Sequence, residues 1–291
     1  VMTLRTVTEA YELIRPQRLA VPLVFSSPHS GRDYPEHFLA RSVLDARVIR
    51  SSEDAYVDEL FAAAPAHGAP LLLARVPRAY VDLNRAADEF DPALIEGVQR
   101  APHNPRISSG LGVIPRVVAQ GRPIYHGKIP RSEADLRIAR FWHPYHAALH
   151  ALTDEATRRF GQSVLIDCHS MPREALEGQV RPGFARPEVV LGDRYGAAAG
   201  REVVDRLEQA FRSAGLRVAR NSPFAGAYIA QAYGRPSRRQ HVVQVEIDRS
   251  LYLDEAQVLR SADFDAFRKL VDGVVATVVA GFRPNTALAA E

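Results

Sequence analysis

The segment VLIDCHS, residues 164–170, carries an apolar run directly into His169, and PLVFSSPHSG, residues 22–31, does the same with His29. Short runs rich in Val, Ile and Leu are typical of strands buried on both faces, as in a parallel sheet. The carboxyl ends of parallel strands lie at one edge of the sheet, where ligands bind. We therefore expect both histidines at that edge, where they indicate a metal site.

The rest of the chain alternates apolar runs with longer helical patterns, as a helix-covered sheet requires. The expected strands are Pro22–Ser27, Pro70–Arg75, Ala79–Leu83, Ser163–Cys168, Glu188–Gly192, Leu216–Ala219 and His241–Ile247. The expected helices are Glu53–Ala64, Ser132–Phe160, Gly196–Ala214 and Asp254–Phe282. This order predicts an α/β fold, a single three-layer domain over residues 1–291 with a mostly parallel mixed sheet flanked by helices.

Two long irregular stretches, Ala86–Arg131 and Pro172–Pro187, interrupt this alternation. Loops of such length inside a compact domain are usually functional. Both leave the expected sheet near a strand-end histidine, so we expect them to form the walls of a cleft. Ordinary surface insertions are the alternative.

The composition, with 46% hydrophobic and 24% charged residues, is ordinary for a soluble globular protein. The net charge is only +3, and no basic block alternates with aromatic residues, which argues against a nucleic-acid partner. Cys168 is the single cysteine, so no intrachain disulfide is possible. Neither a membrane-spanning run nor a leader is recognisable. We expect a cytoplasmic enzyme with a small anionic substrate and leave its oligomeric state open.

A third ligand is required if the histidines hold a catalytic zinc, which takes three protein ligands and leaves a fourth position to water. Glu53 and Asp54 open the helix expected after His29, and the residues alone leave both open. Cys168 is a softer ligand than either. However, side chains alternate along a strand and point Cys168 away from the face of His169, so we expect a buried structural thiol.

The segment VPRAYVDLNR, residues 76–85, places Arg78, Asp82, Asn84 and Arg85 along or just beyond one expected strand. An arginine beside an asparagine amide suits a bound carboxylate. A surface ion-pair network is the alternative.

Glu246 lies inside the apolar run VVQVEI, residues 242–247. A carboxylate in a buried strand costs free energy unless it is paired or functional. Beside an activated water it would serve as a general base with a raised pKa. An ion pair to Arg249 or Arg78 is the alternative.

Three further histidines fall on one face of an expected helix, namely His143, His146 and His150. That helix already has an apolar stripe, and no acidic residue follows as in metalloprotease helices, so we expect these histidines to be structural. The chain also lacks the G-x-S-x-G pattern of a serine nucleophile.

Taken together, these motifs resemble the N-formylglutamate amidohydrolase family. The resemblance rests on SPHSGRDYP (27–35), DLNR (82–85), residues 121–130, DCHSMP (167–172), LGDRYG (191–196) and QVEIDRSLYLDE (244–255), in this order. It runs from about Pro22 to Glu255. It implies a fold similar to zinc carboxypeptidases and aspartoacylases, and hydrolysis of N-formyl-L-glutamate to formate and L-glutamate in histidine degradation.

The resemblance also implies roles for particular residues. His29, Asp54 and His169 match the zinc ligands, and Asp54 is favoured over Glu53 because the family has an aspartate there. Glu246 matches the general base, and Arg78 the arginine that polarises the substrate carbonyl. Asn84 and Arg85 match a pair that binds the α-carboxylate. The second substrate carboxylate is expected to bind one of four arginines: Arg106, Arg131, Arg220 or Arg249.

Rival hypotheses remain within and outside this class. Another N-acyl amino acid amidohydrolase or a small carboxypeptidase would use the same scaffold, because loops around the pocket set the acyl size. A non-catalytic binder of acidic amino-acid derivatives would bind its ligand without turnover. Histidines that merely brace strand ends would make chelators ineffective.

Overall fold

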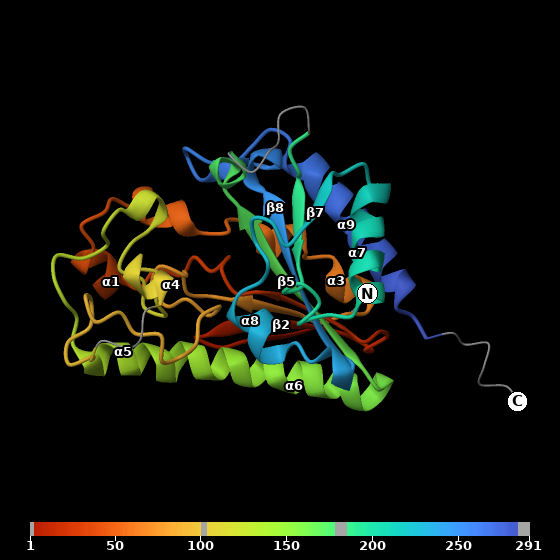
Figure 1. Cartoon of the computed structure of the whole chain (residues 1–291), viewed down its shortest axis with the longest axis horizontal. Coiled ribbons are helices and arrows are strands. Elements are labelled where there is room, and N and C mark those ends of the chain that lie inside the picture. The colour runs from red at the N-terminus through yellow and green to blue at the C-terminus, as the bar shows by residue number, and fades with distance from the viewer. Residues whose placement is uncertain (1–2, 100–103, 178–184, 285–291) are drawn as a thin grey trace, which may run out of the picture.

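An eight-stranded sheet forms the centre of the computed structural model, which describes residues 3–99, 104–177 and 185–284 (Figure 1). Its strands are β1 (Thr3–Val7), β2 (Tyr11–Pro16), β3 (Leu23–Ser27), β4 (Leu71–Ala74), β5 (Ser163–Met171), β6 (Val189–Gly192), β7 (Val218–Arg220) and β8 (Gln240–Asp248). Their order across the sheet is β1-β2-β4-β3-β5-β8-β6-β7. Four neighbouring pairs are parallel: β4–β3, β3–β5, β5–β8 and β6–β7. The expected mostly parallel mixed sheet is confirmed.

The central strands β3, β5 and β8 follow the expected pattern most closely. Every residue of β3 and β5 is buried, because both faces of the sheet are covered. β5 pairs in parallel with β3 on one side and with β8 on the other. The carboxyl ends of these three strands therefore lie side by side, as the proposed site requires.

The strand expected at Ala79–Leu83 is wrong. These residues form turns and loop, although all five are buried. Tyr80 and Val81 donate their backbone N–H groups to the carbonyl of Pro77, which starts a turn in place of a ladder. The buried Arg137 donates to the carbonyl of Tyr80 at 3.0 Å. An apolar, β-branched run predicts burial, but here its backbone hydrogen bonds are made to a turn and to a helix side chain.

The N-terminal hairpin was not predicted. β1 pairs with β2, and β2 with β4, both antiparallel, at one edge of the sheet. All five residues of β1 are exposed, so its sequence carries no apolar alternation to reveal a strand.

Three of the four expected helices are shorter or more broken than the sequence predicts, and several short helices were not expected. They are α1 (Glu36–Arg41), α2 (Val57–Leu60), α3 (Ala64–His67), α4 (Pro105–Ser108), α5 (Arg131–Arg137), α6 (His143–Phe160), α7 (Arg201–Ser213), α8 (Tyr228–Tyr233) and α9 (Phe264–Gly281). Short 3-10 turns are η1 (Val48–Ser52), η2 (Ala119–Gly121), η4 (Arg173–Leu176), η5 (Pro236–Arg238) and η6 (Arg249–Leu251). None of the helices among the described residues is long and apolar enough to cross a membrane.

Of the expected helices, one is interrupted and one is confirmed over its whole length. The helix expected at Glu53–Ala64 is interrupted because Tyr56 has a left-handed backbone with φ 62°. The helix expected at Ser132–Phe160 is continuous from α5 to α6 through a π-helical turn, Ile138–Trp142. It ends at Gly161 in the left-handed conformation, which glycine adopts without a steric penalty. Gly196–Ala214 shortens to α7. Asp254–Phe282 shortens to α9, after a small hairpin of β9 (Leu253–Asp254) and β10 (Leu259–Arg260).

Each face of the sheet has its own hydrophobic core. One core holds residues of α7, α9 and the alternate strand residues Ile166 and Cys168. The other holds residues of α6, Leu165 and much of the 86–131 stretch, including Leu94, Ile95, Val113, Ile114, Ile124 and Ile129. Figure 1 shows α6 along one side of the sheet and α7 and α9 along the other. The long 86–131 stretch is thus a packed layer in its described part.

Candidate active site

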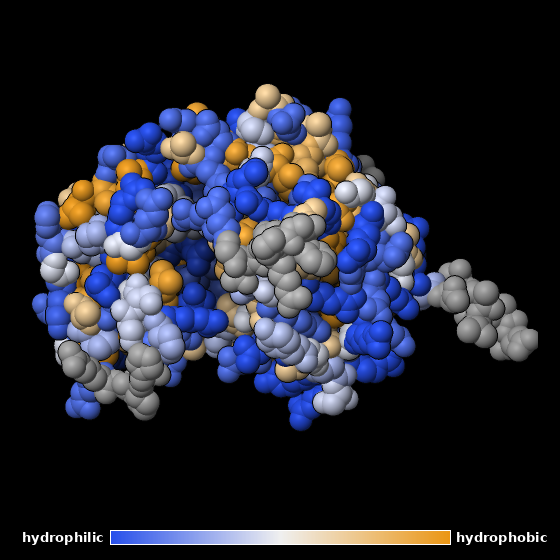
Figure 2. Space-filling model, turned by 45° about the horizontal axis from the view of Figure 1, so that its top comes forward, coloured by the Kyte–Doolittle hydropathy of each residue, from blue (hydrophilic) through white to orange (hydrophobic). Residues whose placement is uncertain are grey.

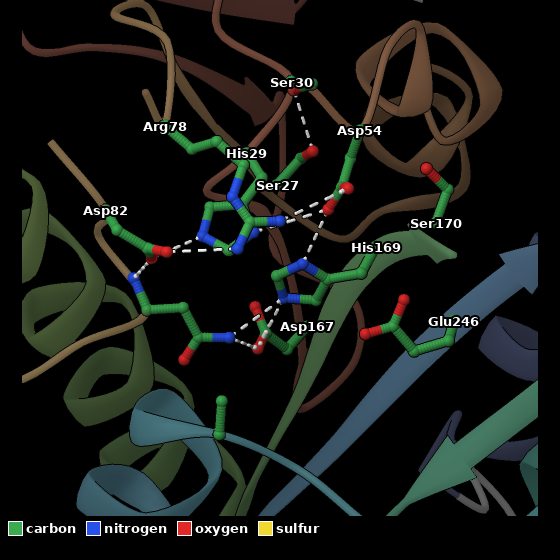
Figure 3. Close-up of polar contacts among 12 residues, drawn as sticks. Ser27, His29, Ser30, Asp54, Arg78, Asp82, Asp167, His169, Ser170 and Glu246 are labelled. Carbon is green, nitrogen blue, oxygen red and sulfur yellow. Dashed lines mark hydrogen bonds and ion pairs between the residues drawn. The ribbon is translucent and has the colours of Figure 1, made fainter. Parts of the chain in front are cut away.

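Three side chains from separate elements converge at the carboxyl edge of the sheet. His29 follows β3, His169 lies near the end of the adjacent strand β5, and Asp54 follows η1. Asp54 Oδ2 is 2.9 Å from His169 Nδ1 and 3.4 Å from His29 Nδ1. All three side chains are buried, and one ligand atom of each lies within 4.8 Å of the others (Figure 3). The structure brings together the residues that the sequence singled out, and this group could hold a metal ion.

Backbone contacts fix the positions of His29 and Asp54. The Asp54 N–H donates to the His29 carbonyl at 3.1 Å, so the two segments are joined directly. Gly31 then lets the chain pass close to residues 75–76, because a Cβ there would lie 2.1 Å from the Val76 carbonyl oxygen. The turn after β3 therefore needs a glycine to hold His29 at this position.

Both histidines are oriented by a second carboxylate. His29 Nε2 lies 2.7 Å from Asp82 Oδ1, and His169 Nε2 lies 3.0 Å from Asp167 Oδ2. When Nε2 donates to a carboxylate, the lone pair of Nδ1 is left for a metal. His29 Nδ1 is buried without a hydrogen-bond partner among the described residues, as a metal ligand requires. This donor set fits a divalent metal.

The surroundings of the histidines are strongly anionic. Burial opposes the charging of His169, but the nearby carboxylates of Asp167 and Asp54 outweigh it and raise the pKa of His169 well above its usual value. The same electrostatic field favours any cation at this position. The sequence did not predict these supporting roles of Asp167 and Asp82. For Asp167 the available signal was its position inside a buried strand, two residues before a histidine.

Two arginines contact the acidic member of the group. Arg249 Nη2 donates to Asp54 Oδ1 at 2.9 Å, and Arg78 Nη1 lies 3.7 Å from the same oxygen. Burial alone would raise the pKa of Asp54, but His169, His29 and Arg78 hold it well below its usual value. Asp54 is therefore a permanent anion at neutral pH.

Glu246 lies on β8 directly beside His169 on β5 in the strand register. Burial is the main cause that raises its pKa to about 7, with a further contribution from the charge of Asp54. Its Oε1 accepts a hydrogen bond of 2.8 Å from Gln244 Nε2. Among the described residues it forms no ion pair, so the alternative of a salt bridge to Arg249 or Arg78 does not apply. A buried carboxyl that titrates near neutrality is suited to proton transfer.

The segment after Pro77 brings its polar side chains inside, and the alternative of a surface ion-pair network is excluded because Asp82, Asn84 and Arg85 are buried. Arg78 Nη2 donates to Asp82 Oδ2 at 3.1 Å. Arg85 donates from Nε to the Leu111 carbonyl and from Nη1 to the Asn84 carbonyl, at 3.0 and 2.9 Å. Nη2 of Arg85 makes no hydrogen bond within the described part of the chain.

Three of the four arginines considered for a second carboxylate already bind acidic residues. Their contacts are Arg131 with Asp135, Arg220 with Asp205 and Glu208, and Arg249 with Asp54. Arg106 is exposed, and its side chain has no ion pair or hydrogen bond within the described part of the chain. Its carbonyl accepts from the N–H of Leu111 at 2.8 Å, and the Leu111 carbonyl accepts from Arg85. Burial and the charges of Arg78 and Arg106 lower the pKa of Arg85, which is consistent with this proximity.

The other candidate ligands lie elsewhere. Glu53 accepts hydrogen bonds from Arg50 at 3.0 Å and from the Tyr34 hydroxyl at 2.6 Å. Cys168 points into the core on the opposite face of the sheet from His169, where burial raises the pKa of its thiol. The expectation of a buried structural thiol agrees with this placement.

Of the three helical histidines, His146 has a structural role, whereas His143 and His150 are exposed. His146 Nδ1 lies 2.8 Å from the Tyr233 hydroxyl and Nε2 lies 2.9 Å from the Leu83 carbonyl, so neither nitrogen is free for a metal. The ring stacks on Trp142 at 3.9 Å between centroids. Burial lowers the pKa of His146 to about 4, and the imidazole is neutral.

The described parts of both long irregular stretches meet near this site. Gln120 and Arg122 from the first and Pro172 and Glu174 from the second line a cavity of about 470 Å³ that also contacts Arg249. Figure 2 shows a hydrophilic hollow in the surface, between the part that holds α1 and α4 and the part that holds the sheet. Residues 100–103 and 178–184 of the two stretches lie outside the described residues.

The fold and the site define an α/β protein with a buried, metal-compatible His–Asp–His group beside a buried carboxyl group whose pKa is raised to about 7. Comparison with known proteins narrows this class. The profile of the N-formylglutamate amidohydrolase family matches residues 21–253, and the chain belongs to that family. The matched range agrees closely with the resemblance noted from the motifs.

Individual relatives agree with this assignment. The chain is 30% identical over 251 residues to the N-formylglutamate deformylase of Pseudomonas aeruginosa, which covers 84% of this chain and 86% of that protein. It is 28% identical over 243 residues to the Pseudomonas putida protein of the same name, covering 81% and 84%. The crystal structure of N-formylglutamate amidohydrolase from Ralstonia eutropha superposes with a TM-score of 0.88 at 35% identity, covering 94% of this chain and 99% of that one.

Proposed function

We propose that this protein is a metal-dependent amidohydrolase that cleaves N-formyl-L-glutamate to formate and L-glutamate. The family and the names of its relatives supply the substrate. The single observation that supports the chemistry is the buried group of His29, Asp54 and His169 beside Glu246. Burial raises the pKa of Glu246 to about 7. Histidine degradation as the source of the substrate, and a cytoplasmic location, stay predictions.

We propose zinc as the metal, held by His29, Asp54 and His169. Two imidazole nitrogens and one carboxylate oxygen suit zinc, and catalytic zinc sites have three protein ligands. When bound, the metal would polarise the formyl carbonyl and lower the pKa of a water molecule toward neutrality. Asp82 and Asp167 would keep Nδ1 of each histidine directed at the ion.

Glu246 is the proposed general base and acid. It takes a proton from the water that adds to the formyl carbon, and it returns this proton to the departing amino nitrogen as the C–N bond breaks. Efficient proton transfer needs a group whose pKa is close to the working pH, and the value of about 7 meets this condition.

Arg78 is proposed to stabilise the negative charge that develops on the formyl oxygen, since its guanidinium lies next to Asp54 at the metal group. Arg85 is proposed to bind the α-carboxylate through its unused Nη2. Asn84 was expected to share that task. Its side-chain contacts with Asp167 and His169 favour a role in supporting the metal group instead.

For the second substrate carboxylate we propose Arg106. It is the one of the four candidate arginines whose described side chain contacts no acidic residue. It lies in α4, and its carbonyl accepts the N–H of Leu111, whose own carbonyl holds Arg85. Two arginines that are not neutralised by the protein match the two carboxylates of glutamate.

The deciding experiment measures formate release from N-formyl-L-glutamate by the purified protein, before chelation, after it, and with zinc restored. We expect release that chelation abolishes and zinc restores. Release that is insensitive to chelation would contradict the metal mechanism. No release, together with activity on N-acetyl or peptide substrates, would support the rival N-acyl amidohydrolase or carboxypeptidase. Binding of N-formyl-L-glutamate without turnover would support a non-catalytic binder.

A further inference from the structure

The side chain of Gln244 links the proposed base to the residue that precedes α8. Gln244 and Glu246 are two residues apart on β8, so their side chains share one face of the sheet. Gln244 Oε1 accepts the N–H of Ala227 at 2.9 Å, and Nε2 donates to Glu246 Oε1 at 2.8 Å. The N–H of Ala227 fixes which end of the amide is oxygen, so the NH₂ group must face Glu246.

The side chain of Asn84 repeats this arrangement at the metal group. Asn84 Oδ1 accepts the N–H of Ile229 at 2.7 Å, and Nδ2 lies 3.3 Å from Asp167 Oδ2 and 3.2 Å from His169 Nε2. Asp167 therefore receives hydrogen bonds both from Asn84 and, in the orientation a metal requires, from His169. Figure 3 shows Asp167 and His169 close together at the centre of this group.

Both amides end on the same short segment, residues 227–229, where α8 begins. The first N–H groups of a helix have no partner within the helix, and here two of them bind side chains from other elements. Gln244 and Asn84 are both buried, so neither amide has an alternative partner in water. Each amide is held by a backbone N–H of this segment and in turn holds a carboxylate at the site by a hydrogen bond.

We propose that Gln244 and Asn84 are positioning residues that act as paired amide braces, Gln244 for the base Glu246 and Asn84 for the Asp167–His169 pair that holds the metal. This inference rests on the proposed function and goes beyond it. It moves Asn84 from substrate binding to metal support. It also explains a polar side chain inside the apolar run of β8 that the sequence left without a role.

The Gln244 brace is tested by kinetics. Gln244→Met keeps the length of the side chain but removes donor and acceptor, and Gln240→Met, the same change on the same strand away from Glu246, is the control. We expect kcat to fall about tenfold to a hundredfold in Gln244→Met while KM changes less than about threefold, because a hydrogen bond to a charged group is lost without loss of substrate contacts. An unchanged kcat, or an equal fall in the control, would overturn this role.

A second variant covers the case in which Gln244→Met does not fold. Gln244→Glu keeps an oxygen for the N–H of Ala227 and places a second carboxyl oxygen, in place of the NH₂ donor, against Glu246. Two carboxyl groups this close cannot both ionise freely, so the pKa of the base also shifts. We expect it to retain the wild-type circular dichroism spectrum and to lose kcat as Gln244→Met does. A wild-type kcat together with an unchanged pH profile of kcat in this variant would equally reject the brace.

The Asn84 brace is tested without substrate. We expect Asn84→Leu to bind zinc about tenfold to a hundredfold more weakly than wild type in competition with a chelating dye, as for other groups behind metal ligands. Asn221→Ala is the control, because Asn221 is a buried asparagine that binds Asp193 and none of the proposed ligands. Wild-type zinc affinity in both Asn84→Leu and Asn84→Asp, combined with a raised KM, would return Asn84 to substrate binding. Since zinc competition needs no turnover, this result is independent of whether the wild type releases formate.

Discussion

Two buried carboxyl groups, those of Asp54 and Glu246, face the same site, and their surroundings shift their pKa values in opposite directions. Asp54 lies among His29, His169, Arg78 and Arg249, and its pKa is held well below the usual range. Glu246 receives one hydrogen bond, from the uncharged amide of Gln244, and burial raises its pKa to about 7. The protein thus prepares one carboxylate as a permanent anion for a metal and another as a group that exchanges a proton near neutral pH.

The largest effect is expected from removing the titrating carboxyl. Glu246→Gln keeps the shape and the hydrogen bond from Gln244 but cannot accept a proton. We expect kcat to fall by about 10²–10⁴-fold, as for other general bases, while zinc is retained. Steady-state kinetics and metal analysis check this, with Glu255→Gln as a control at a half-buried glutamate lining the nearby cavity. Normal turnover in Glu246→Gln would remove Glu246 as the base.

The complementary change tests the permanent anion. We expect Asp54→Asn to weaken zinc binding by more than about a hundredfold, because it removes a charged ligand. This exceeds the effect typical of losing a residue that only hydrogen-bonds to a ligand. Glu53→Gln is the matched control, since Glu53 binds Arg50 and Tyr34 away from the group. Competition with a chelating dye gives both affinities. If Glu53→Gln weakened zinc binding more than Asp54→Asn, Glu53 would be the ligand, and Asp54 would not be the anion that holds the metal.

The same contrast predicts an effect on stability. In the metal-free protein the pKa of Glu246 rises from 4.5 to about 7 on folding, so the folded state binds more protons than the unfolded state between these pH values. Stability is therefore lost as pH rises through this window, up to about 3 kcal/mol above pH 7. Glu246→Gln lacks this penalty. With chelator present, urea denaturation should find the variant more stable than wild type at pH 8 and the difference much smaller at pH 5. Equal differences at both pH values would contradict the raised pKa.

The sequence predicted the residues of the site better than the contacts among them. His29 and His169 were predictable because two apolar runs end in histidine and parallel strands bring their ends together. The strand expected at Ala79–Leu83 failed because burial and β-branching do not distinguish a strand from a buried turn. The roles of Gln244 and Asn84 were invisible for a related reason. Their partners, residues 227–229, lie 17 positions from Gln244 and 145 from Asn84, and they act through backbone N–H groups, which no side-chain pattern records.

The smallest effect is expected from substituting an arginine. Here too two groups of one kind differ in their surroundings, because one arginine is paired with a carboxylate and another is not. Arg249 forms an ion pair with Asp54, whereas the side chain of Arg106 has no acidic partner among the described residues. Arg106→Ala should raise KM for N-formyl-L-glutamate about tenfold, the value of one charge-assisted hydrogen bond, and leave KM for N-formyl-L-alanine nearly unchanged. Arg131→Ala, on a residue already bound to Asp135, is the control. Arg85→Ala should raise KM for both substrates, because both carry an α-carboxylate. If Arg106→Ala affected the two substrates equally, the side-chain carboxylate would have to bind elsewhere, and Arg106 would serve only as a general positive charge near the site.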